Sequence, residues 1–492
     1  LNSKDMLGSD RTDISLMTVG ADVSRTQTWD KSAFAGKIQY TNLLPYFALV
    51  SQDLEWDKAP ESVSGNFLFR TKTSKTGILK LYTSVNRSTL DLIEPDPFTE
   101  GVKNPVGIAN DYLYVNGSYK EIISEKTGFQ TGISFTGNKD VAYQGDDQRT
   151  DNDKGVHLKS KFDIQLTEKI SLNTGAELFA RKYERELSNN TGSLFQHQNE
   201  MSGAAYAETE AYASNKFVLR SGARLAYNSI TEKASLLPRF SAAYQTGENS
   251  QASVGYGQFQ QLPEYDLLLE NSALGAEKAT HYIANYQVTK GNKTFRVEAY
   301  QKTYESLAKV GTNGYVNSGE GYARGVDLFW RDNETFDNVD YWISYSYLDT
   351  ERNYRDFPGS FTPNFASKHN FSFVYKQFVS SLKSQVGLTY SYTSGRPYHN
   401  PNRAGFNQEM TPGYHDVSFN VAYLYSPSVI FYTSVSNVLG SEQIFNYTYS
   451  DQPNAEGIYD RVAITPPASR FIFVGVFITL AKNQTLNQLP NL

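Results

Sequence analysis

The chain has 492 residues, no cysteine, and 46 Lys and Arg against 52 Asp and Glu, for a net charge of -6. The absence of cysteine excludes disulfides and thiolate metal sites, and without a basic stripe we expect no nucleic-acid partner. A chain of this length ordinarily folds as about three domains. No Pro- or Ser-rich linker or charged block divides it, so we expect one large domain.

The segment 156–185, VHLKSKFDIQLTEKISLNTGAELFARKYER, alternates apolar and polar residues in two runs. A period of two is that of a β-strand, whose successive side chains point to opposite faces. Joining the runs as a hairpin aligns the apolar faces and sets Lys159 opposite Glu177. A second hairpin built in the same way sets Glu210 opposite Arg220, and opposite charges across a ladder favour that register.

Similar hairpins recur from Asp13 to Leu480. A soluble β-sandwich explains one such hairpin, but its core fills at about 100 residues. We therefore predict an all-β fold, a transmembrane antiparallel β-barrel whose apolar face meets lipid and whose polar face lines the lumen. The expected lipid-facing residues are Phe162, Ile164, Leu172, Ala207 and Leu219, and the expected lumenal residues are Lys159, Asp163, Glu177, Glu210 and Arg220.

Connections between the expected strands alternate between short and long. Ten short links, such as Thr167–Lys169 and Ser214–Lys216, alternate with ten longer ones, such as Asn86–Asn110, Phe259–Lys278 and Ser394–Tyr414. Outer-membrane barrels have short periplasmic turns and long extracellular loops, so we expect all the long links at one rim. Twenty links imply about 21 strands in this chain, and because bacterial barrels have an even number we predict about 22 in all.

The first link is short, so the first strand would run downward, and we expect one upward strand to be missing before Leu1. The predicted organisation is a remnant of an upstream loop at 1–11, the barrel at 12–480 and a C-terminal tail at 481–492. A chain that does not begin with Met and carries no signal peptide is expected to be a mature or trimmed product.

Several motifs, taken in order, resemble the strands of one family. They are LLPRFSAAYQTGENSQASVGYGQFQQLPEYDLLLENSALGAEKATHYIANYQ, YVNSGEGYARGVDLFW, YTSGRPYHNP, SVSNVLG and PPASRFIFVGVFITL, with QDLEWDKAPES and FRTKTSKTG nearer the start. Their order is similar to that of TonB-dependent outer-membrane receptors of the Bacteroidetes type. The resemblance covers most of the chain, without the family's N-terminal plug domain and with twelve residues after the usual last strand.

The resemblance implies a bacterial outer-membrane protein that imports a scarce nutrient, such as a ferric siderophore or cobalamin, by active transport. Its partners would be outer-membrane lipid and lipopolysaccharide, a plug domain encoded upstream or as a separate chain, TonB acting through that plug, and a small-molecule or metal-chelate cargo. The alternative is a plugless passive porin. We expect no enzyme, because no nucleophile elbow, Walker loop or zinc-protease motif is present, and no cofactor.

Ligand candidates combine cations with aromatic planes in one expected loop: Arg396, Tyr398, His399, Arg403 and Tyr414. Such a set suits a bulky, partly anionic cargo. Equally, the tyrosines would be girdle residues and the arginines would bind lipopolysaccharide phosphates. The acidic run Gly145–Gly155 has the carboxylates for a hard cation, but a solvated loop is the preferred interpretation, and no metal site is predicted.

Overall fold

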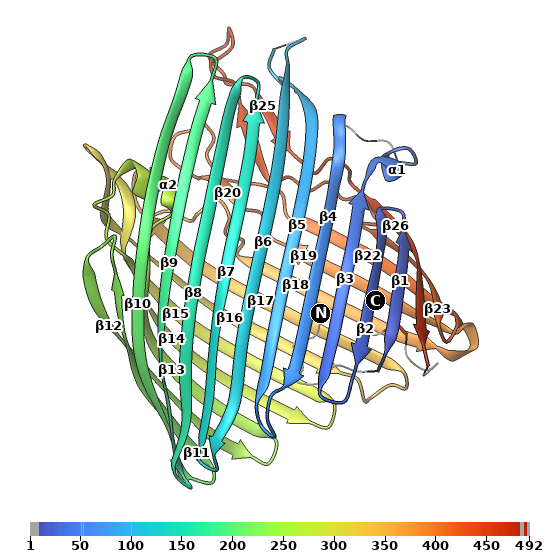
Figure 1. Cartoon of the computed structure of the whole chain (residues 1–492). Coiled ribbons are helices and arrows are strands. Elements are labelled where there is room, and N and C mark those ends of the chain that lie inside the picture. The colour runs from blue at the N-terminus through green and yellow to red at the C-terminus, as the bar shows by residue number, and fades with distance from the viewer. Residues whose placement is uncertain (1–8, 51, 53, 100, 483–486, 490–492) are drawn as a thin grey trace.

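The computed structural model describes residues 9–482, except 51, 53 and 100, together with 487–489. It is a closed antiparallel barrel of 22 strands, in which each strand pairs with its neighbours along the chain and the first pairs with the last. The tilted strands surround a wide interior (Figure 1). In the described part of the chain, no helix has the length and apolar character needed to cross a bilayer.

The barrel strands are β1 (Arg11–Met17), β2 (Gly20–Thr28), β3 (Ser32–Asn42), β4 (Glu55–Lys72), β5 (Ile78–Pro95), β6 (Lys103–Ser124), β7 (Thr127–Gln144), β8 (Asp147–Thr167), β9 (Ile170–Asn189), β10 (Gly192–Ser214), β11 (Phe217–Asn228), β12 (Lys233–Gly247), β13 (Ser250–Gln261), β14 (Glu277–Lys290), β15 (Lys293–Gly311), β16 (Gly314–Asp332), β17 (Val339–Asn353), β18 (His369–Val379), β19 (Ser384–Thr393), β22 (Tyr414–Ser426), β23 (Val429–Ser436) and β26 (Phe471–Ala481). The connections hold α1 (Leu44–Phe47), α2 (Tyr265–Glu270), the 3-10 turn η1 (Ser380–Leu382) and two small hairpins, β20 (Pro397–Tyr398) with β21 (Glu409–Met410) and β24 (Asn446–Tyr449) with β25 (Arg461–Ile464).

The predicted cross-strand partners are confirmed. Lys159 lies opposite Glu177, and Glu210 lies opposite Arg220. The turn between β8 and β9 is one residue shorter than the predicted Thr167–Lys169. The register shifts after Gln165, so Thr167 belongs to the ladder and pairs with Ile170. The apolar faces stay aligned, since the shift affects only the end of the ladder.

The connection α2 identifies the inner face of the sheet. It joins β13 to β14 yet contacts both β10 and β16. These strands lie on either side of its own hairpin, so α2 reaches both only from the concave side. Arg185 contacts Asp266 there and Tyr183 packs on Tyr265, which places Arg185, Tyr183 and the other residues on this face of β9 inside the barrel. All ten residues assigned to a face from the sequence lie on the predicted side.

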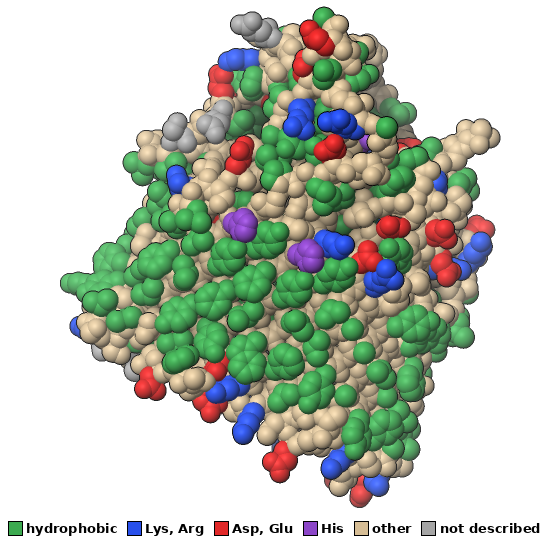
Figure 2. Space-filling view, turned by 180° about the vertical axis from the view of Figure 1, so that it is seen from behind, with side chains coloured by type: hydrophobic (Ala, Val, Ile, Leu, Met, Phe, Trp, Pro, Cys, Tyr) green, Lys and Arg blue, Asp and Glu red, His purple; other side chains and the backbone are tan. Residues whose placement is uncertain are grey.

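The outer face is apolar only over the height of a membrane. On β8 the outward residues from Val156 to Leu166 are mostly apolar and span eleven residues, the length of a transmembrane β-strand. Above them, Lys154 of β8 lies opposite Lys182 of β9. Figure 2 shows the apolar zone on the far side of the barrel, with charged side chains gathered at its lower edge.

Two expectations about the strands are corrected. This chain supplies all 22 strands, because Thr18–Val19 is a tight turn and β1 is the first upward strand; β1 closes the barrel by pairing with β26. The prediction of 21 strands and a missing one was therefore wrong. The loop expected over residues 1–11 lies mostly outside the described residues, as does most of the tail.

Several links predicted to be long are tall hairpins. Strand β5 continues to Pro95 and β6 begins at Lys103, inside the loop predicted at Asn86–Asn110. Strands β5–β10 have 18 to 23 residues and rise highest in Figure 1. The alternation fades above the membrane because both faces there meet water, although the backbone ladder continues.

The described tail residues lie over the barrel closure. The amide of Gln488 donates to the backbone oxygen of Ile478 at 3.3 Å, and Leu489 packs against a cluster that contains Ile430 and Phe477. Phe477 pairs with Ser15 of β1, so this segment covers the inner side of the junction between the first and last strands.

Candidate functional site

The inner wall of the barrel carries paired charges. Glu177 accepts a hydrogen bond from Arg224 Nη2, and its Oε2 lies 3.3 Å from His157 and 3.7 Å from Lys159. Nearer the short turns, Arg220 pairs with Glu210. These groups come from different strands, and the pleat points all of them inward. This part of the inner wall is therefore polar, and its carboxylates are paired with cations.

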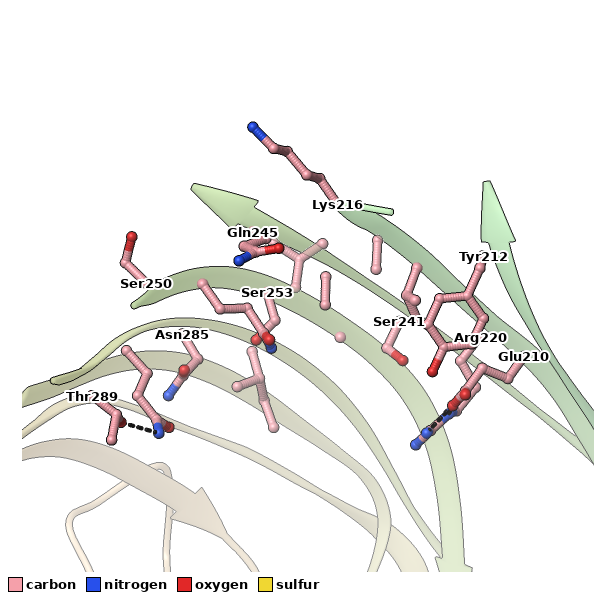
Figure 3. A pocket seen from close by; sticks show the side chains of 18 of the residues that line it. Glu210, Tyr212, Lys216, Arg220, Ser241, Gln245, Ser250, Ser253, Asn285 and Thr289 are labelled. Atoms are coloured by element: carbon pink, nitrogen blue, oxygen red, sulfur yellow. Dashed lines mark hydrogen bonds and ion pairs between the residues drawn. The ribbon is translucent and has the colours of Figure 1, made fainter. Parts of the chain in front are cut away.

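A cavity of about 910 Å³ lies against this wall between β10 and β15. Ser241, Ser253 and Asn285 contribute uncharged polar groups, and the Glu210–Arg220 pair closes one side (Figure 3). Hydroxyl and amide groups present hydrogen-bond donors and acceptors without a fixed charge. This part of the lumen suits polar contacts with another molecule or domain.

The link that contains α2 folds into the upper lumen. Leu268 and Leu274 are almost fully buried and form a small apolar core with Ala308 of β15. Pro263 precedes the helix and lacks a backbone donor, so it suits a position just before the first turn. Burial of these leucines holds the short helix in place, because six residues are too few for a helix that is stable by itself.

Ion pairs fasten α2 to the wall formed by β8–β10. Arg185 is nearly buried; its Nη2 donates to Asp266 Oδ1 at 2.5 Å and its Nε to Asp151 Oδ1 at 2.9 Å. The guanidinium of Arg181 lies 4.3 Å from the centre of the Tyr265 ring. The Arg185–Asp151 pair has little exposure on either side and is therefore stronger than a surface pair, whereas Asp266 is 46% exposed.

Tyr265 completes this contact. Its hydroxyl donates to Glu200 of β10. Burial raises the pKa of Tyr265, and the hydrogen bond to the Glu200 carboxylate raises it further. The phenol consequently stays protonated and remains a donor at physiological pH.

Four of the five predicted ligand residues lie in the connection between β19 and β22 and Tyr414 begins β22, but the five do not form a single cluster. Tyr398 is buried, accepts a hydrogen bond from Arg461 Nη1 at 3.0 Å and packs on Tyr447. Exposed His399 stacks on Phe406 with ring centres 5.4 Å apart. Tyr398 is thus part of the loop scaffold, whereas His399 is accessible.

The other three predicted residues are separated from this pair. The backbone of Arg396 bonds with Thr411 across the base of the loop. Arg403 is exposed and lies 3.7 Å from Glu409, and the hydroxyl of Tyr414 donates to Asp416 at 3.2 Å. The positive charge of Arg403 is therefore partly compensated within the protein.

Four extracellular connections are linked at the mouth. Asn402 and Tyr459 exchange hydrogen bonds of 2.7 and 2.8 Å, and Asn407 donates to the backbone of Thr362. Arg355 Nη2 donates to Glu264, beside α2, at 2.7 Å. The connections after β13, β17, β19 and β23 thus support one another over the lumen.

Sequence reasoning missed the cluster around Arg185. Its members come from β8, β9, β10 and α2, and Arg185 and Asp266 lie 81 positions apart. The acidic run at Gly145–Gly155 was a partial signal, because Asp151 and Asp153 pair with arginines of β9. Within the described residues, no group of three His, Asp or Glu side chains is arranged to hold a metal ion.

A closed barrel with an apolar band outside and a polar, loop-covered interior is a transmembrane β-barrel of the wide class. A family model described as "TonB dependent receptor-like, beta-barrel" matches residues 17–438. The chain belongs to this family: it is a transporter of the bacterial outer membrane that takes part in active nutrient import, and not an enzyme. A comparison with curated proteins found no match.

Similar solved structures share this fold. The ferripyoverdine receptor of Pseudomonas aeruginosa has a TM-score of 0.78 and 10% identity, with 97% of this chain and 72% of that chain covered. The ferric yersiniabactin uptake receptor FyuA from Yersinia pestis has a TM-score of 0.75 and 9% identity, with 97% of this chain and 81% of that chain covered. The ferric-catecholate import receptor Fiu from E. coli K12 has a TM-score of 0.73 and 11% identity, with 96% of this chain and 82% of that chain covered.

Proposed function

We propose that the cargo is a ferric siderophore or cobalamin. The observation that carries this proposal is the combination of a family match over residues 17–438 with a barrel mouth rich in aromatic and arginine side chains. Several similar structures are named as receptors for iron chelates. Arginine and aromatic planes suit a bulky chelate with oxygen donors on its surface.

Within the mouth, the proposed contact residues remain Arg396, Tyr398, His399, Arg403 and Tyr414. His399 and Arg403 are the most accessible and would contact the cargo first. Tyr398 would act by holding the loop through its contacts with Arg461 and Tyr447. Exposed arginines at this height would also bind the phosphates of lipopolysaccharide.

The remaining proposed partners are a plug domain, encoded upstream or as a separate chain, and TonB, which would act through that plug. The polar inner wall and its cavity of about 910 Å³ support this, because hydrated polar contacts contribute little free energy each and so separate more readily than a packed apolar core. In a planar bilayer, the barrel alone should form large, weakly selective pores that a plug domain closes. A barrel that is tight by itself would argue against the plug.

Growth of a deletion strain tests the cargo. We expect growth of the deletion strain to fail on one low-level iron chelate or cobalamin source and to return when the wild-type gene is restored. His399→Ala with Arg403→Ala should raise the concentration needed for half-maximal growth about tenfold. Lys368→Ala, a cation of a neighbouring loop that lies beside the Tyr347 ring, is the control. A passive porin would instead give uptake that does not saturate.

A further inference from the structure

One row of residues on the upper inner face of the tall hairpins is largely apolar, at a height that lipid does not reach. Cross-strand partners run in one row from β5 to β10: Leu90, Ile108, Ala142, Arg149, Leu187 and Leu194. Leu187 has the parity of Arg185, which contacts α2, so the row faces inward. The exposed fraction is 49% for Ile108 and 55% for Leu194. Apolar side chains grouped in this way indicate a binding surface.

Membrane lipid does not account for this row. The row lies above Lys154 and Lys182, which face outward just beyond the apolar band. The outer face at the same height is mixed, since Tyr143 donates to Asp91 there at 3.0 Å and Phe195 is exposed opposite Glu186. The apolar side chains of this row are therefore directed toward the interior of the barrel mouth and not toward the membrane.

A cavity of about 760 Å³ lies along this row. That volume is typical of small-molecule sites, which combine apolar walls with a few polar groups. Ile108, Leu187 and Leu194 provide the walls, and Arg149 lies between them in the row. A protein segment has less reason to fill it, because the cavity is confined to five strands rather than extended over the rim.

The charges of the cavity indicate the ligand class. Its lining contains one arginine, Arg149, and one carboxylate, Asp147. Arg149 Nε already donates to Asp151 at 2.7 Å, and its two Nη atoms lie 3.4 Å from Asp266. The two long contacts can be exchanged for a ligand oxygen, but no cation is left to neutralise a highly charged anion.

We propose that this surface binds the cargo on its way to the lumen, and that the cargo is a chelate of little net charge with an apolar body and oxygen acceptors. The inference rests on the proposed import function and narrows it. It favours a neutral ferric tris-hydroxamate or cobalamin over a trianionic ferric tris-catecholate. The apolar body lies on Ile108, Leu187 and Leu194, and one oxygen accepts from Arg149.

The lack of cysteine in the chain allows a contact-based test. Leu194→Cys and, as a matched control, Phe195→Cys are prepared in the full protein in nanodiscs and reacted with a maleimide. Phe195 is equally exposed, at 59%, but on the outer face of the same strand. The probes are a neutral ferric tris-hydroxamate, cyanocobalamin and a ferric tris-catecholate, each titrated to saturation.

We expect one of the two neutral probes to slow labelling at position 194 at least fivefold, with no effect at 195. Adding Leu187→Asn should abolish this protection. Failure of both neutral probes to protect, equal protection at both positions, or protection by the tris-catecholate alone overturns the proposal. Protection in native outer membranes by another surface protein, without either neutral probe, would assign the surface to a protein partner instead.

Uptake by intact cells distinguishes a failure of the proposed binding site from a failure of the import function. If position 194 is protected but cells import none of the probes, the site stands and the import function fails. If cells import a neutral probe that gives no protection, import stands and the proposed site fails. Leu187→Asn should raise the half-saturating concentration for uptake at least tenfold without changing the maximal rate.

Discussion

The environment of each barrel residue depends on the face of the sheet to which its side chain points and on its position along the strand, within the membrane or above it. Phe162 and Lys161 are neighbours in sequence, but Phe162 points to lipid, whereas Lys161 points into the lumen and lies 3.1 Å from Asp163. A charged group costs much more in lipid than in a hydrated lumen. Adjacent substitutions on β8 should therefore have very different effects.

Phe162→Arg tests this distinction. Because Phe162 lies within the band, we expect a loss of about 2–4 kcal/mol in the free energy of unfolding. Lys161→Gln, on the other face, should cost less than about 1 kcal/mol, the usual range of an exposed ion pair. Denaturant titration of both variants folded into lipid vesicles provides the measurement. Equal losses would mean that the two faces are not assigned correctly.

The face to which each side chain points was predictable, because it follows from the local alternation of apolar and polar residues. The cross-strand pairs Lys159–Glu177 and Glu210–Arg220 were predictable for the same reason. The contacts of Arg185 were not predictable. Its parity says only that it points inward, whereas its partner Asp266 is brought there by the packing of α2. Contacts between distant segments require the closed barrel, which single-strand patterns do not specify.

At the scale of the element, α2 is a short helix held by its surroundings. Burial of Leu268 and Leu274 positions it, and the ion pairs of Asp266 with Arg185 and Arg149 connect it to the tall hairpins. Asp266 is itself 46% exposed on its side chain. Water screens its interactions, so each contributes modestly.

Asp266→Asn keeps the shape of the side chain and removes its charge. We expect the amides of α2 to exchange hydrogen faster, with a local opening free energy lower by about 1 kcal/mol. Glu270→Gln at the exposed end of the same helix is the matched control and should leave exchange unchanged. Hydrogen exchange followed by mass spectrometry resolves the segment. Unchanged protection in Asp266→Asn would show that the leucines alone hold α2.

Element positions were predicted better than element lengths. The short turns at Thr167–Lys169 and Ser214–Lys216 were located to within a residue, because they interrupt an alternating pattern. The tops of β5–β10 were taken for loops, since outside the membrane neither face must be apolar. The strand β1 was missed because Thr18 and Val19, the two residues between β1 and β2, are typical of strands and not of turns.

For the whole molecule, the pairing of β1 with β26 makes the barrel a closed shell with two unlike rims. The tall hairpins and linked connections lie at one rim, and the short turns at the other (Figure 1). Molecules of the extracellular medium are met only at the first. The orientation of the shell therefore decides which residues reach the medium.

Single cysteines report this orientation, because the chain has none of its own. Thr191→Cys, at the turn between β9 and β10, should react with a membrane-impermeant maleimide added to intact cells. Glu168→Cys, at the opposite rim, should react only after the outer membrane is permeabilised. Labelling of Glu168→Cys alone in intact cells would show that the barrel has the opposite orientation, and the sites assigned to the extracellular rim would then face the periplasm.

Active import through this barrel is tested most directly by the rate at which whole cells take up a labelled cargo. Cells with the wild-type chain should take up a ferric chelate or cobalamin at nanomolar to micromolar concentrations, saturably, and a protonophore that collapses the proton-motive force should reduce the rate at least tenfold. Binding to the cell surface should persist in the protonophore. Uptake that rises linearly with concentration and is insensitive to the protonophore would contradict active transport and identify a passive pore.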